Sequence, residues 1–149
     1  MTLLSRPRAF ATALMLALVA AGPAQAAIEV LVAQSPAPPP GAPTAAVYVS
    51  LRNTGKQADQ LLGAATPVAG MAMIHGEQLE GGMMRMRPES SLPIAPGATL
   101  AMHAGGTHVM LMDLKRPLLA GQRFPLVLRL ARAGEVRAEV VVLPLGSRP

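Results

Sequence analysis

The sequence of 149 residues contains no cysteine, no tryptophan, one tyrosine and two phenylalanines. The lack of cysteine excludes disulfide bonds, thiolate metal ligands and a cysteine nucleophile. The 13 Lys and Arg residues exceed the 8 Asp and Glu residues modestly, and no basic run occurs. This distribution favours neither nucleic acid nor a membrane surface as a partner. The folded chain must therefore be stabilised by an aliphatic core.

The first 26 residues have the features of an export signal. Two arginines precede an apolar run over residues 9–21, which is shorter than the roughly 20 residues of a membrane-spanning helix. An Ala-x-Ala signal-peptidase site follows at residues 24–26, and no later cysteine is available to carry a lipid. We expect a cleaved signal peptide over residues 1–26 and a periplasmic protein of residues 27–149 without membrane insertion. The alternative is an uncleaved N-terminal anchor.

Residues 27–149 predict one all-β domain. Short apolar or alternating segments are separated by proline and glycine turns, and no capped helical stripe exceeds about two turns. Such regular short strands favour an antiparallel β-sandwich or barrel of Greek-key type. The expected strands are residues 28–34, 44–53, 59–66, 71–79, 83–87, 99–103, 107–114, 124–131 and 136–143.

Methionine is over-represented in the same part of the chain, with eight of the ten methionines after residue 26. One interpretation is that these flexible side chains fill the core in place of aromatic residues. A second follows from strand periodicity, since residues i and i+2 share a face. This rule pairs His108 with Met110, and it likewise pairs Met73 with His75 and Met84 with Met86.

Paired imidazole and thioether groups suit copper(I), whereas magnesium and calcium prefer oxygen ligands. Only the histidines of such a site lose a proton, so metal binding should weaken as the pH falls through the imidazole range. A redox copper enzyme would require a cysteine thiolate, and a hydrolase of the Gly-x-Ser-x-Gly type has no matching motif here. We therefore expect a binding protein and not an enzyme.

Four of these residues carry a family resemblance. His75, Met86, His108 and Met110 are separated by ten, twenty-one and one intervening residues, and this spacing resembles the signature of the periplasmic copper chaperone PCu(A)C family. The segments TAAVYVSLRNTG and GGTHVMLMDLKRPLLAGQRFPLVLRLARAG look like that family too. Departures are a threonine before His108 and a glycine after His75.

The resemblance implies a cupredoxin-like β-sandwich that binds one copper(I) per chain through those four side chains near one end. Because a partner ligand must enter before the donor leaves, we expect the site to lie at the loop end of the sandwich and to be partly exposed. The resemblance also implies delivery of copper to the binuclear copper centre of cytochrome c oxidase, alongside a thioredoxin-like assembly factor. Buffering of periplasmic copper and a metal-free structural or interaction sandwich are the alternatives. The sequence leaves the oligomeric state open.

The remaining candidates receive weaker assignments. His103 lies outside the signature and is expected to face solvent. Met73, Met84 and Met112 are expected in the apolar shell of the site or in the core, with one of them a candidate copper or partner contact. No role is assigned to the other methionines of the domain, which are Met71, Met83 and Met102.

Overall fold

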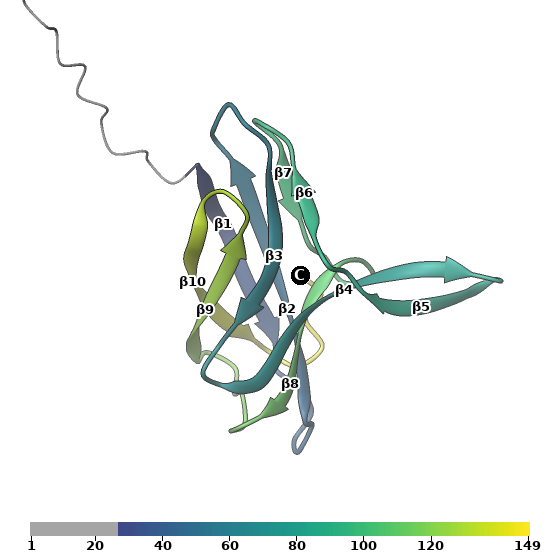
Figure 1. Ribbon diagram of the computed structural model, residues 1–149. Helices are drawn as coiled ribbons and strands as arrows, with labels where there is room; N and C mark the ends of the chain where they lie inside the picture. Colours follow the sequence, from purple (N-terminus) through teal and green to yellow (C-terminus); the bar gives the residue numbers. More distant parts are fainter. Residues whose placement is uncertain (1–26) are drawn as a thin grey trace, which may run out of the picture.

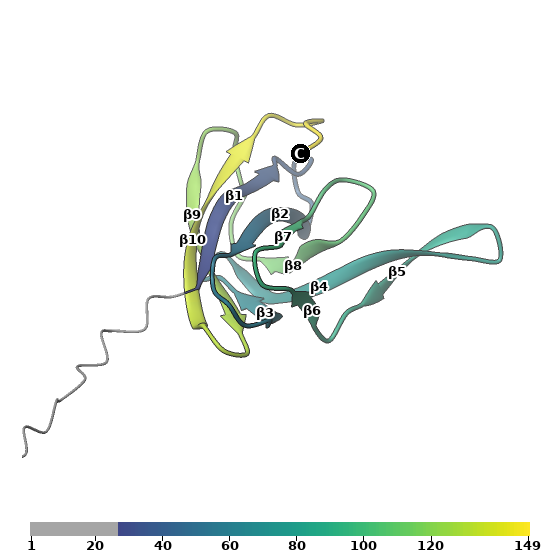
Figure 2. The ribbon, with the colours of Figure 1, turned by 90° about the horizontal axis from the view of Figure 1, so that it is seen from above.

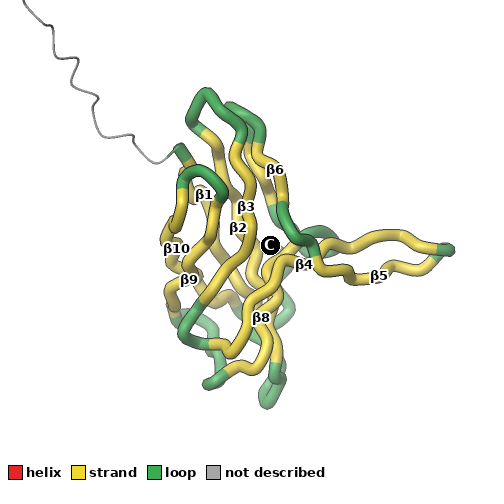
Figure 3. The backbone as a smooth tube through the Cα atoms, in the orientation of Figure 1, coloured by secondary structure: helices red, strands yellow, loops and turns green. Residues whose placement is uncertain are grey.

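The computed structural model describes residues 27–149, which fold into ten β-strands joined by turns and loops (Figures 1 and 3). The strands are β1 (Ile28–Pro36), β2 (Thr44–Asn53), β3 (Asp59–Ala65), β4 (Ala69–Glu80), β5 (Met83–Pro88), β6 (Leu92–Ile94), β7 (Thr99–Ala101), β8 (His108–Leu114), β9 (Arg123–Leu130) and β10 (Gly134–Leu143). The predicted signal peptide, residues 1–26, lies outside the described residues. Within residues 27–149, no helix has the length and apolar character needed to cross a membrane.

The strands form one strongly curved sheet in the order β5-β4-β8-β2-β1-β10-β9-β3-β6. Two strands share one edge of β2: β8 pairs with residues 44–47 and β7 pairs with residues 50–52. Seen from above, the sheet wraps around a common interior (Figure 2). Val47 and Val109 from one side, and Leu61 and Leu128 from the other, belong to a single buried cluster. This arrangement is the predicted cupredoxin-like all-β sandwich.

All but one of the strands match a predicted segment, with small shifts at their ends. The prolines around β6 concealed that strand, which pairs with β3 at the sheet edge, where a proline is tolerated. All pairs are antiparallel except β1 with β10, which run parallel over residues 34–36 of β1. In β2 the predicted alternation is confirmed, because Val47, Val49 and Leu51 are fully buried while the residues between them are half-buried.

The interpretation of methionine as a core filler is wrong for most of these residues. Only Met102 belongs to the core of the described chain. Met84, expected in the shell or core, is 58% exposed, and Met73 and Met112 are half-buried. The core is instead filled by valine, leucine and isoleucine together with Phe124. The methionines therefore need an explanation other than packing of the interior.

Two buried polar side chains fix the loops beside the sheet. Asn53 is fully buried and donates from Nδ2 to the carbonyls of Gln57 and Ile94, while its Oδ1 accepts from the Gly55 N–H. The Asp59 carboxylate accepts N–H bonds at the β9–β10 turn. Both residues satisfy their polar atoms inside the fold, as buried polar groups must.

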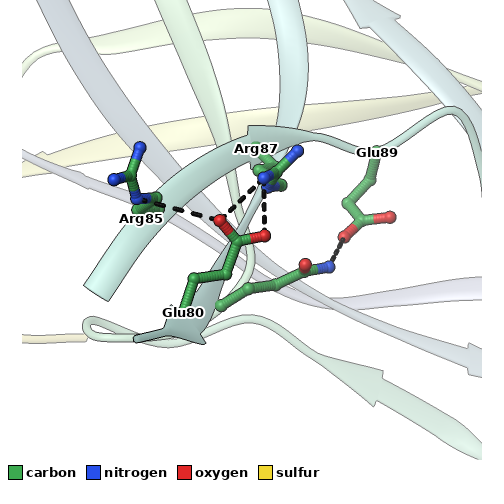
Figure 4. A network of polar contacts seen from close by, with 5 residues as sticks. Glu80, Arg85, Arg87 and Glu89 are labelled. Carbon is green, nitrogen blue, oxygen red and sulfur yellow. Dashed lines mark hydrogen bonds and ion pairs between the residues drawn. The ribbon is translucent and has the colours of Figure 1, made fainter. Parts of the chain in front are cut away.

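Strands β4 and β5 form a hairpin that projects from the body as an arm (Figures 1 and 2). Its two-residue turn is Gly81-Gly82, with φ of 57° and 82°, which matches a type I′ turn whose twist suits a hairpin. One face of the arm carries Glu80 between Arg85 and Arg87 (Figure 4). Strand alternation places Met84 and Met86 on the opposite face.

Candidate metal centre

The pairing of β4 with β8 places the two histidines of the predicted site directly opposite one another. His75 and His108 are register partners, and their ring centroids lie 5.9 Å apart in an edge-to-face arrangement. A metal–imidazole bond of about 2.0 Å, plus about 1.2 Å from ring nitrogen to centroid, allows two rings on one ion to be separated by up to roughly 6.4 Å. The observed separation lies within that reach.

The loop before β8 fixes the tautomer of His108. His108 Nδ1 lies 3.1 Å from the carbonyl oxygen of Gly106, and because a carbonyl only accepts, Nδ1 carries the proton. Nε2 of the neutral ring then presents a lone pair, and this atom is buried with no hydrogen-bond partner. A histidine whose other nitrogen donates to a backbone carbonyl is the usual state of a metal ligand.

The Gly105-Gly106 pair makes this loop possible. Gly105 has a φ of 83°, which favours glycine. At Gly106 a Cβ atom would lie only 2.6 Å from the ring of His103, so a side chain there would displace that ring. His103 itself is exposed, as the sequence predicted.

The surroundings of His75 favour the neutral form of its ring. Burial lowers its pKa below the ordinary histidine value, and the neighbouring His108 lowers it further. Its Nδ1 is also buried without a hydrogen-bond partner. Two orphaned imidazole nitrogens on adjacent strands are costly for a structural protein, and neither atom is engaged by another group of the described chain.

Thioethers surround the pair on the same sheet face. Met110 lies two residues beyond His108, is half-buried and stands directly opposite Met73 on β4. Met86 lies on β5 opposite Glu77, which is two residues beyond His75 toward the tip of the arm. The Met86 side chain is 54% exposed. The structure thus brings His75, His108 and Met110 together and places Met86 at the base of the arm.

Three neighbours were missed or undervalued from the sequence. Tyr48 on β2 has its ring 6.1 Å from that of His108, and its pKa is raised by burial and then by the charge of Glu77. Glu77 shares the face of His75, which its i+2 position could have indicated. Met73, expected in the apolar shell or core and one of three candidates for a further copper or partner contact, occupies the position opposite Met110. Tyr48 gave no sequence signal, because its contact depends on the β2–β8 register.

The donor set is soft. Among residues 27–149, no three His, Asp or Glu side chains are grouped so as to hold a metal ion. The face that carries the two imidazoles also carries Tyr48 and Glu77, and its remaining donors next to the histidines are the thioethers of Met73, Met86 and Met110. Soft thioether with imidazole is the combination that selects copper(I). Fold and site together define a β-sandwich domain with an imidazole pair and thioethers on one sheet face, which is the donor set of a soft-metal-binding domain.

Comparison with known proteins gives the family. The chain belongs to the LpqE-like family, described as putative lipoprotein LpqE-like, whose model matches residues 28–142. Putative lipoprotein Lxx21020 from Leifsonia xyli subsp. xyli is 34% identical over 90 residues, which cover 60% of this chain and 54% of that relative. The chain therefore spans about half the length of this curated relative.

Solved structures confirm the resemblance to the PCu(A)C family. Apo-DR1885 from Deinococcus radiodurans is 30% identical with a TM-score of 0.57, covering 97% of this chain and 94% of that one. The structure described as CuI-DR1885 is 32% identical with a TM-score of 0.56, covering 75% of each chain. The apo PCuAC domain of PmoF1 is 25% identical with a TM-score of 0.66, covering 78% of this chain and 92% of that one.

Proposed function

We propose that this protein is a periplasmic copper(I) metallochaperone that carries one ion on His75, Met86, His108 and Met110. The single observation that supports this most strongly is the pair of buried imidazole nitrogens without hydrogen-bond partners, Nδ1 of His75 and Nε2 of His108. The tautomer of His108, set by the Gly106 carbonyl, leaves the lone pair on Nε2 free for a metal.

In this proposal the two histidines fix the ion and the methionines exchange. His108 is 3% exposed and held by a backbone hydrogen bond, so it remains in place when metal leaves. Met86 is 54% exposed on the arm, and a thioether is an uncharged donor on a flexible side chain. An acceptor ligand can therefore approach the ion from the side of Met86 before the histidines release it.

We propose the binuclear copper centre of cytochrome c oxidase as the acceptor, with a thioredoxin-like assembly factor acting alongside. The relatedness to PCuAC domains, one of them described with copper(I), supports carriage of the metal. Export is supported by the putative lipoproteins among the relatives and by the predicted signal peptide. Carriage of copper requires no catalysis by this chain.

A competition titration tests the site. The chain of residues 27–149, which contains the whole described fold, is titrated with copper(I) against a chromophoric copper(I) chelator. We expect one tightly bound equivalent, lost in His75→Ala/His108→Ala and retained in the matched control His103→Ala, whose histidine is exposed. Equal retention of copper(I) by the double variant would refute the site and favour a metal-free structural sandwich.

A transfer experiment separates delivery from buffering. The copper(I)-loaded protein is mixed with the soluble copper-binding domain of the oxidase subunit, with and without a thioredoxin-like reductant, and copper on the acceptor is measured after separation. Delivery predicts faster transfer from the protein than from a small-molecule copper(I) complex of equal affinity. Transfer at or below the rate of that complex would indicate buffering.

A further inference from the structure

The methionines near the site continue away from it in two paired positions. On β4 and β8, Met71 lies directly opposite Met112, and Met73 lies directly opposite Met110. We call these four residues the methionine ladder. Directly opposed residues of an antiparallel pair have Cβ atoms about 4.5–5.5 Å apart. The ladder therefore holds four thioethers within reach of one another on one sheet face.

The ladder lies outside the core. The residues that alternate with it, Ile74, Val109 and Leu111, are buried in the interior, so the methionines point to the opposite face. Met71 is 51% exposed and the other three are half-buried. Their side chains are thus accessible from solvent.

The composition of the neighbouring strand leaves thioether as the dominant donor there. On β2, Ala46 lies opposite Met110 and Thr44 lies opposite Met112. Neither contributes a charged group, so no carboxylate or amine on the adjacent β2 position competes with sulfur for a soft ion. The three rotatable bonds of each methionine allow sulfurs from adjacent positions to turn toward a common point.

We propose that Met71, Met73 and Met112 form a second, thioether-only site for copper(I), separate from the histidine pair and weaker than it. Thioether ligands select copper(I) over harder ions. This proposal rests on the function proposed above, because it takes Met110 as a ligand of the histidine site. That site holds one ion. The second ion adds to that one, and three neutral donors without an imidazole should bind it less tightly.

Silver(I), which has the same soft character without redox chemistry, is the probe for the test. The chain of residues 27–149, with methyl groups of methionine labelled with ¹³C, is titrated while the methyl resonances are followed by NMR. We expect the first equivalent to shift Met86 and Met110, and the second to shift Met71, Met73 and Met112. A titration that saturates at one equivalent with the methyls of Met71 and Met112 unmoved would overturn the second site.

Variants keep the two proposals distinguishable. Met71→Leu/Met112→Leu should abolish the second equivalent and retain the first. Such volume-conserving changes are usually well tolerated, and thermal unfolding of the apo protein verifies the fold. Met83→Leu, an exposed methionine on the other face of the arm, is the matched control and should retain both equivalents.

The histidine variant completes the design. In His75→Ala/His108→Ala the tight equivalent should disappear while the methyl shifts of Met71, Met73 and Met112 persist. If those shifts vanish together with the histidines, the ladder is no independent site and the second proposal fails. If the tight equivalent persists while the ladder also binds, the proposed function fails and the second site stands.

Discussion

Replacing His75 by leucine should make the apo protein more stable while removing copper binding. No hydrogen bond holds the His75 ring in the described structure, and its Nδ1 is buried without a partner. A buried polar atom left unsatisfied costs about 1–3 kcal/mol. Leucine has a similar volume, so the substitution removes that cost without opening a large cavity. We expect the free energy of unfolding to rise by about 1 kcal/mol, which raises Tm by about 2–8 °C.

The pH dependence of stability supplies an independent readout of the same substitution. Since burial and then His108 lower the pKa of His75 in the folded state, the unfolded state binds its proton first as the pH falls. The pH-dependent part of the unfolding free energy that comes from His75 is fully present above its pKa in the unfolded chain, about 6.5. It is lost as the pH falls through the lower pKa of the folded state. The loss below pH 6.5 should therefore be smaller in His75→Leu than in the native chain.

Urea denaturation of the apo proteins between pH 5 and 8, with and without silver(I), measures both effects. A ligand at 1,000 times its Kd adds about 4 kcal/mol to the native protein, and most of this gain should be absent in His75→Leu. His103→Leu, at an exposed position, should change stability by less than about 0.5 kcal/mol. An apo His75→Leu protein less stable than the native chain by 1 kcal/mol or more would refute the reasoning, because the imidazole would then be stabilising.

Three further substitutions test the fold and the ligand set. Gly105→Ala places a Cβ on a residue with a φ of 83°, a conformation that favours glycine. We expect the loop that carries the Gly106 carbonyl to shift and copper(I) binding in the chelator competition to weaken at least tenfold. Asp59→Asn removes a buried carboxylate. Burial raises the pKa of Asp59, but its backbone N–H bonds and Arg132 outweigh burial, so that the pKa is lowered on balance. The variant should therefore lose about 1–3 kcal/mol of unfolding free energy in urea denaturation at pH 7, and this difference should shrink as the pH falls through the folded-state pKa. Met86→Leu should weaken copper(I) binding more than Met73→Leu, because the family spacing identifies Met86 as the ligand. The reverse order in the same titration would assign the fourth ligand to Met73 on β4.

The sequence was sufficient for the fold because local signals and burial agree along most of the chain. The alternation in β2 predicts its buried face correctly, and the Gly81-Gly82 pair predicts the turn that brings β5 back along β4. The strand β6 could not be predicted, because the prolines in and around its three residues conceal it and because it is held at the edge by pairing with β3. Its formation depends on a distant strand and on the Asn53 hydrogen bond to Ile94.

The candidate site was predictable in part. Strand periodicity alone places Met110 beside His108 and Met73 beside His75, but it gives no information on which strands are neighbours. The β4–β8 register, which sets the two imidazoles opposite one another, is a long-range property. The burial of the His108 Nε2 atom and the contact with Tyr48 depend on that register and on the loop before β8, so neither could be derived from spacing.

The distribution of methionine explains how a small cysteine-free domain can offer soft ligands without weakening its interior. A flexible thioether specifies a core poorly, and here the core consists mainly of branched aliphatic residues, with Met102 as the one buried methionine of the described chain. The ladder, with Met84 and Met86 on the arm, occupies the outer face of β5, β4 and β8 instead. That face is backed by a rigid sheet, so donors keep fixed spacing while each side chain remains free to rotate. Rigid spacing with mobile sulfur is what a carrier requires, because it must present its ligands to an ion and then release the ion to another protein.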